Sequence, residues 1–208
     1  MKNICVIDYG LGNLNSVKNM INYLGHKADL ISDQDKVSDF DKIILPGVGS
    51  FDTGIKNLKR MNLFEKIKDL VINKNKSILG ICLGAQLMLD KSEEGKEKGM
   101  SLISGRSVSF SKKINESETN LPVPNMGWRN VDFKDNNGLT FHKEPSKFYF
   151  VHSYFFDLKF DKDVWGKSNY GFDFVAAFKK DNIYGVQFHP EKSHKYGINL
   201  LKHFIEDE

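Results

Sequence analysis

The sequence predicts an α/β protein built on an open, doubly wound, mostly parallel sheet with helices on both faces and added antiparallel strands. Short apolar runs alternate with amphipathic stretches through the first half of the chain, as in a parallel sheet covered by helices. From about residue 102 to residue 188, alternating aromatic and β-branched residues are typical of antiparallel strands. The 208 residues, 40% of them hydrophobic, suit one domain spanning 1–208 with a substantial core.

The elements of the first half follow from this alternation. Apolar runs predict buried strands at 4–7, 28–31, 43–45 and 77–79. Helical patterns predict helices at 14–24, 54–59, 63–73 and 85–89. The first of these helices is expected to end at Gly25, because glycine often follows the last turn of a helix.

The second half adds three expectations. The polar stretch 111–120 is expected to be a mobile surface loop. Residues 183–188 predict a strand, and residues 196–204 predict a final amphipathic helix.

Composition argues against several classes of function. The net charge of +3 is small and the lysines are scattered, so no nucleic-acid partner is expected. The first residues carry no signal-like apolar stretch and no apolar run is long enough to span a bilayer, which indicates no membrane association and a cytoplasmic location. Two cysteines do not make a disulfide framework, and Cys5 is expected in the core of the first strand. The histidines at 26, 142, 194 and 203 lack metal-ligand spacing, so neither metal nor cofactor is expected.

Cys82 stands at a predicted turn between a strand and a helix. Gly80 and Gly84 flank it, and such a sharp turn needs small residues on both sides to expose the nucleophile. The position at a helix N-terminus favours the thiolate, and the backbone N–H of Leu83 would point at an oxyanion formed beside the sulfur. The alternative is a buried structural cysteine, and the turn alone does not decide between the two.

His189-Pro190-Glu191 follows the predicted strand 183–188. In an extended segment, residues two apart project to the same side, so Glu191 could orient the His189 imidazole. Cys82, His189 and Glu191 would then supply a nucleophile, a general base and acid, and an orienting carboxylate.

The alternatives of another class are a nucleotide-binding module and a non-catalytic scaffold. Gly10-Leu11-Gly12 follows the first strand and opens a helix, as in a nucleotide-binding module, but Asn15 occupies the place of the third glycine. A non-catalytic scaffold is disfavoured because all three triad residue types are present.

Seven ordered motifs resemble the class I glutamine amidotransferases, and within them the glutaminase subunits of imidazole glycerol phosphate synthases. The resemblance covers nearly the whole chain. The motifs are Asp8-Tyr9-Gly10-Leu11-Gly12-Asn13, Pro46-Gly47-Val48-Gly49, Gly80-Ile81-Cys82-Leu83-Gly84-Ala85-Gln86, Ser92-Glu93-Glu94-Gly95, Gly127-Trp128, Tyr149-Phe150-Val151-His152-Ser153-Tyr154 and Gln187-Phe188-His189-Pro190-Glu191-Lys192-Ser193.

The resemblance implies roles for further residues. Val48 and Gly49 would lend the second donor of an oxyanion hole, beside Leu83. Gln86 and Glu94 would hold the amino-acid end of L-glutamine, and His152 and Ser153 would line its pocket, chiefly through backbone groups. Asn13, Trp128, Tyr149 and Lys192 match positions near a partner interface.

The resemblance also implies hydrolysis of L-glutamine to glutamate and ammonia, with ammonia passed to a (β/α)8-barrel cyclase in a heterodimer. That cyclase would make imidazole glycerol phosphate and an aminoimidazole carboxamide nucleotide in histidine biosynthesis. Where the family commonly has Pro-His-x-Gly-Trp-Asn, this chain has Asn125 and Arg129 in place of the histidine and the final asparagine. This departure leaves open a related glutaminase subunit that supplies ammonia for amidination of a bacterial surface sugar.

Overall fold

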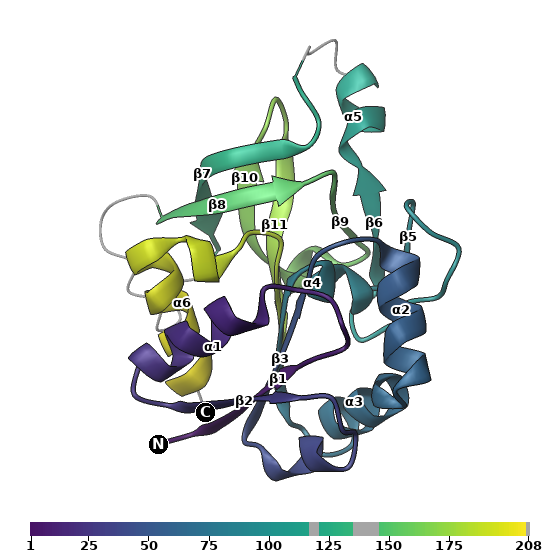
Figure 1. The fold of residues 1–208 in the computed structure, drawn as a ribbon. Coiled ribbons are helices and arrows are strands. Elements are labelled where there is room, and N and C mark those ends of the chain that lie inside the picture. The colour runs from purple at the N-terminus through teal and green to yellow at the C-terminus, as the bar shows by residue number, and fades with distance from the viewer. Residues whose placement is uncertain (117–120, 135–145, 207–208) are drawn as a thin grey trace.

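The computed structural model describes residues 1–116, 121–134 and 146–206 (Figure 1). Within them, 12 strands join into one sheet whose main path runs β2-β1-β3-β4-β12-β11-β10-β7-β8. Strands β9, β6 and β5 branch from β11. The predicted α/β class, with added antiparallel strands, is confirmed.

Parallel strands form one half of this sheet. They are β1 (Asn3–Ile7), β2 (Lys27–Ile31), β3 (Lys42–Gly47), β4 (Ser77–Cys82) and β12 (Ile183–Val186). Strand β12 pairs with β4 in parallel and with β11 in antiparallel fashion, so it joins the two halves. The last part of the chain therefore lies directly beside the strand that carries Cys82.

Helices cover both faces of the parallel strands, as expected for a doubly wound sheet (Figure 1). On one face lie α1 (Leu14–Tyr23) and α6 (His194–Glu206), and on the other lie α2 (Phe51–Arg60) and α3 (Leu63–Ile72). The short α4 (Leu83–Leu87) follows β4. Each face has its own apolar cluster, built by residues such as Val17 and Leu200 on the first and Ile55 and Ile67 on the second.

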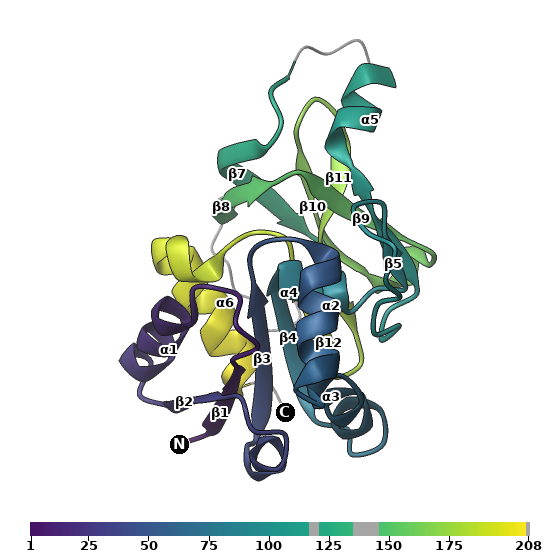
Figure 2. The same cartoon turned by 45° about the vertical axis from the view of Figure 1, so that its right-hand side comes forward.

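Most of the antiparallel part stands beyond the carboxyl ends of the parallel strands, while the second half of β11 runs alongside β12 (Figure 2). The antiparallel strands are β6 (Gly105–Ser109), β7 (Asn125–Phe133), β8 (Ser146–His152), β9 (Tyr154–Leu158), β10 (Val164–Asn169) and β11 (Asp173–Lys180), and the two-residue β5 (Lys91–Ser92) pairs in parallel with β6. Single 3₁₀ turns are η1 (Lys36–Asp39), η2 (Asp161–Asp163) and η3 (Pro190–Lys192).

The expected loop at 111–120 is wrong over its first part, because Phe110–Glu116 form helix α5. Phe110 and Ile114 lie one helical turn apart and are both buried, with the Phe110 ring against His152, Phe155 and Phe174. These two apolar anchors give the polar stretch a packed face. Residues 117–120 lie outside the described part of the chain.

Candidate active site

The turn between β4 and α4 has the sharp geometry expected from its glycines. Cys82 has φ 53° and ψ −112°, a left-handed conformation that costs energy for a residue with a side chain. A Cβ on Gly84 would lie 1.7 Å from the carbonyl oxygen of Leu45, and one on Gly80 would lie 2.6 Å from the Cα of Ala85. Close packing of α4 against β3 and β4 therefore requires both glycines.

His189 and Glu191 form a buried pair behind the thiol. The Nδ1 atom of His189 lies 2.7 Å from Oε1 of Glu191, and the two side chains are only 2% and 3% exposed. The expected extended backbone is wrong here, because Pro190–Lys192 form the 3₁₀ turn η3. Proline favours the first position of a helical turn, and the N–H of Lys192 donates to the carbonyl of His189 to close it.

The electrostatics of His189 favour its protonated form. Burial lowers its pKa, but hydrogen bonding and charge attraction from Cys82 and Glu191 outweigh burial and raise it to about 10. Among the described residues, Nε2 of His189 has no hydrogen bond of standard geometry. Since Nδ1 faces Glu191, Nε2 is the nitrogen left to exchange a proton with a group beside Cys82.

A pocket of about 360 Å³ opens over Cys82. Its wall brings together most of the residues expected from the sequence: Val48, Gly49, Cys82, Leu83, Gln86, Glu94, His152, Ser153 and His189. Pro124, Val151 and Tyr154 complete the lining. Glu191 is not part of the wall and lies behind His189.

The Val48–Gly49 segment reaches the pocket because of strand register. Gly47 at the end of β3 pairs with Cys82 at the end of β4, so the next two residues leave the sheet beside the sulfur. Gly49 has φ +107°, a conformation that favours glycine, and Val48 is 44% exposed. The segment therefore lies at the exposed rim of the pocket.

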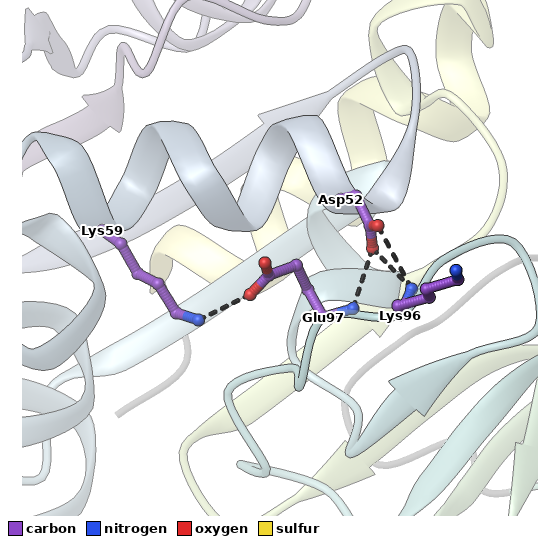
Figure 3. Close-up of polar contacts among 4 residues, drawn as sticks. All are labelled: Asp52, Lys59, Lys96 and Glu97. Atoms are coloured by element: carbon purple, nitrogen blue, oxygen red, sulfur yellow. Dashed lines mark hydrogen bonds and ion pairs between the residues drawn. The ribbon is translucent and has the colours of Figure 1, made fainter.

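Glu94 is held in the pocket wall by contacts with α2. Its Oε2 accepts the backbone N–H of Phe51 at 2.9 Å. Asp52 in the same turn accepts the backbone N–H groups of Lys96 and Glu97, and Lys59 pairs with Glu97 at 2.7 Å (Figure 3). The backbone donors of Glu97 and Lys96 hold the pKa of Asp52 below its ordinary value.

His152 is a neutral, hydrogen-bonded part of the wall. Its Nδ1 donates to the carbonyl of Tyr154 at 2.7 Å, and its Nε2 accepts from the Asn125 amide at 3.0 Å. Burial lowers its pKa to about 3. With both ring nitrogens engaged, His152 can offer a ligand its backbone groups, as the family resemblance implies.

Arg129 continues this network away from the pocket. Its Nε donates to Oδ1 of Asn125 at 2.7 Å, and its guanidinium lies 4.3 Å from the centre of the Tyr170 ring. The two residues that depart from the family pattern thus bond to each other, and Asn125 also bonds His152. They form a support for the pocket wall.

The expected partner-facing residues lie outside the pocket. The Trp128 ring lies 6.1 Å from that of Tyr149, and the ammonium of Lys192 lies 5.8 Å from the Tyr149 ring centre. Trp128 also stacks on His194 and is 44% exposed. Asn13 is exposed at the start of α1, a helix that contacts η3.

Two site residues had no role assigned from the sequence. Gln187 is fully buried and bonds both Cys82 and Gln86. The Tyr9 hydroxyl is buried near Gly47 without a hydrogen-bond partner among the described residues. A polar residue inside an otherwise apolar strand run was the signal available for Gln187.

The fold and the site define a class of α/β proteins with a cysteine at a strand-to-helix turn and a buried histidine–glutamate pair beside it. The chain belongs to the class I glutamine amidotransferase family, an enzyme family whose model matches residues 5–207. This is the family that the sequence motifs resemble.

Curated relatives match over nearly their full length. The chain is 44% identical over 204 residues to an imidazole glycerol phosphate synthase subunit HisH 2 of Methanococcus maripaludis, with 98% of each chain covered. It is 43% identical over 210 residues to the HisH subunit of Haemophilus influenzae, covering 99% of this chain and 98% of that one.

Solved structures share the fold at low sequence identity. A glutamine amidotransferase crystal structure has a TM-score of 0.76 at 15% identity, with 97% of each chain covered. The structure of PurLQS from Thermotoga maritima has a TM-score of 0.75 at 20% identity, with 98% of each chain covered.

Two absences hold for residues 1–116, 121–134 and 146–206. In this part of the chain, no helix has the length and apolarity needed to cross a membrane. No three His, Cys, Asp or Glu side chains in the same ranges are grouped as metal ligands would be.

Proposed function

We propose that this chain is the glutaminase subunit of an imidazole glycerol phosphate synthase. It hydrolyses L-glutamine to glutamate and ammonia and supplies the ammonia to a cyclase partner in histidine biosynthesis. The observation that carries the proposal is the pocket over Cys82, because it joins the thiol, His189, Gln86 and Glu94 in one wall. The names of the relatives support histidine biosynthesis over amidination of a surface sugar.

The chemistry begins with attack of the Cys82 thiolate on the side-chain amide carbon of glutamine. The backbone N–H of Leu83 and the Val48–Gly49 segment stabilise the oxyanion, because donors placed where charge develops lower the barrier. Protonated His189 gives its proton to the departing nitrogen, and ammonia leaves. A glutamyl thioester remains on Cys82.

Hydrolysis of the thioester completes the cycle. Neutral His189 accepts a proton from water as the water attacks the thioester carbon, and collapse releases glutamate and restores the thiolate and imidazolium pair. Glu191 fixes the imidazole so that Nε2 faces the reacting atoms in both steps. The reaction needs neither a cofactor nor a metal.

Side chains on one wall of the pocket recognise the amino-acid end of glutamine, and backbone groups form the opposite wall. The carboxylate of Glu94 suits the ammonium group of the substrate, and Gln86 lies one helical turn from Cys82, within reach of the same end. Backbone groups of His152 and Ser153 supply the opposite wall. The pocket volume of about 360 Å³ lies at the lower end of the range for small-molecule sites.

Because the product is ammonia, the glutaminase needs a partner enzyme that uses it. Ammonia released into water at neutral pH is mostly protonated and cannot act as a nucleophile, so the glutaminase must pass it directly to a synthase. We propose a (β/α)8-barrel cyclase in a heterodimer, docked over the face that carries Asn13, Trp128, Tyr149 and Lys192. The exposed Trp128 ring supports this choice, because exposed aromatic residues are enriched in interfaces.

Three variants test the catalytic assignment. Cys82→Ala and His189→Ala are each expected to lower glutamine hydrolysis by a factor on the order of 10⁴ to 10⁶, while Glu191→Gln acts more mildly because the base remains. Steady-state glutamate release in the presence of the cyclase measures the effect. Residual activity of Cys82→Ala above a tenth of the parent rate would exclude Cys82 as the nucleophile.

Complementation tests the acceptor. A bacterium lacking its own histidine-pathway glutaminase receives this chain together with the cyclase from the same source, and growth without histidine is expected. Failure to grow, with soluble protein and an alkylatable Cys82, would show that the ammonia goes elsewhere. The Cys82→Ala variant serves as the negative control.

A further inference from the structure

Gln187 is buried at the junction of the parallel strands and the pocket. It follows the last residue of β12, and its backbone N–H donates to the carbonyl of Ala176 in β11 at 2.8 Å. Val186 pairs with Ile81 in parallel register, so the next residues of the two strands, Gln187 and Cys82, lie side by side. The Gln187 side chain is fully buried and takes no part in the lining of the pocket.

The side-chain amide of Gln187 joins two residues of the pocket. Its Nε2 donates to Sγ of Cys82 at 3.5 Å, and its Oε1 accepts from Nε2 of Gln86 at 3.0 Å. The bond to Gln86 fixes the orientation of the Gln187 amide. If that amide were rotated by 180°, its NH₂ group would face the NH₂ group of Gln86. Gln86 then keeps its carbonyl oxygen for the pocket, where it suits a hydrogen-bond donor.

We propose that Gln187 is a positioning residue for the glutaminase reaction, with two effects carried by one amide. Its N–H stabilises the Cys82 thiolate relative to the thiol, because a hydrogen bond to an anion is stronger than one to the neutral group. Its carbonyl orients Gln86 so that the Gln86 oxygen accepts from the ammonium of glutamine. The inference rests on the function proposed above.

Other charged or titratable groups around Cys82 remain when Gln187 is replaced. His189 with Glu191 behind it faces the thiol from η3, the Tyr9 hydroxyl interacts with it from the segment after β1, and Glu94 lies across the pocket. The first turn of α4 carries no acidic residue. A changed titration in a Gln187 variant therefore reports the loss of its amide.

The test measures alkylation of Cys82 by iodoacetamide across pH, with modification located by peptide mass spectrometry. Gln187→Met keeps a similar volume without a donor, and it is expected to raise the pH midpoint of alkylation by about one unit. It should also lower kcat and raise the KM for glutamine, each by about tenfold. Asn182→Leu is the matched control, because that amide donates to Val71 and Lys76 at the opposite end of β12.

The outcomes separate this inference from the proposed function. A parent protein that neither reacts at Cys82 nor releases glutamate in the presence of the cyclase would overturn the proposed function itself. A reactive parent with the same pH midpoint in Gln187→Met and Asn182→Leu would overturn the role of Gln187 alone. If Gln187→Met does not fold, Gln187→Glu decides instead: its carboxylate should raise the midpoint, and an unchanged midpoint would contradict the inference.

Discussion

At the scale of single residues, His189 is tuned by its two neighbours. Glu191 stabilises the imidazolium through a direct contact at Nδ1, and the Cys82 sulfur does so from the side of Nε2. His152 nearby is driven the other way by burial and stays neutral. Two histidines in one site therefore differ in protonation because only His189 has anionic partners.

The contact between His189 and Glu191 predicts that replacing Glu191 changes the pKa of His189. In Glu191→Gln the pKa of His189 is expected to fall, because a neutral amide stabilises the imidazolium less than a carboxylate does. NMR of the His189 ring across pH measures the change, with His26 as an internal reference. An unchanged His189 titration would show that Glu191 does not set its charge.

The same shift has a consequence for stability. The folded pKa of His189 lies above the unfolded value of 6.5. Its contribution to the free energy of unfolding is therefore fully present below about pH 6.5. That contribution is lost as pH rises toward about 10. Urea unfolding across this range should show a smaller loss in Cys82→Ala, which lacks one of the two side chains that raise the pKa of His189.

At the scale of elements, the contact between α2 and residues 94–97 positions one wall of the pocket. Asp52→Ala removes the acceptor for the backbone of Lys96 and Glu97, so Glu94 becomes less ordered. The KM for glutamine is expected to rise about three- to tenfold with a smaller change in kcat. Lys59→Ala is the control, because its pair with Glu97 is largely exposed and such pairs contribute little.

The Asp52 contact should also weaken in acid. Its carboxyl pKa is lowered in the folded state, so its stabilising effect is present above the unfolded pKa and is lost as pH falls through the folded value. A KM that rises more steeply in acid for the parent than for Asp52→Ala would support this account. Parallel profiles would contradict it.

Helix α5 depends on one aromatic anchor. Phe110 is fully buried, and its ring contacts Phe155, Phe174 and the His152 ring of the pocket wall. Phe110→Ala is expected to lower the free energy of unfolding by about 3–5 kcal/mol, measured by urea unfolding. Ser111→Ala, at an exposed neighbouring position, should leave it unchanged.

The elements that could be predicted from the sequence are those with strong local patterns. Buried parallel strands and amphipathic helices are visible as apolar runs and periodicity, and glycine spacing marked the Cys82 turn. The helix at 110–116 was missed because its apolar face depends on contacts with β9 and β11. The 3₁₀ turn after His189 has a local cause, because Pro190 favours the first position of a helical turn. The contacts of Gln187 were missed because they depend on pairing between distant strands.

At the scale of the whole molecule, the proposed partner face is connected to His189 by hydrogen bonds. The N–H of His189 donates to the carbonyl of Tyr149, and the Ser193 hydroxyl accepts from the N–H of Tyr149 and donates to the carbonyl of His189. A partner that contacts Tyr149 is thus linked to His189 by these hydrogen bonds.

The exposed Val48–Gly49 rim predicts partner-dependent activity. We expect the isolated chain to be a poor glutaminase that the cyclase activates by orders of magnitude, because the oxyanion donor of this rim is expected to point away from Cys82 until a partner docks. Ser193→Ala should reduce the activation ratio more than the basal rate. Equal rates with and without cyclase would show that the site is already complete in the isolated chain.

The placement of β12 beside β4 also bears on biosynthesis of the enzyme. A ribosome adds His189 on the order of ten seconds after Cys82, at typical elongation rates. During that interval β4 lacks its neighbour and presents an unpaired apolar edge, of the kind that chaperones protect. A nascent chain therefore carries Cys82 before its proposed base, and we expect no glutamine hydrolysis until translation has passed the last strand.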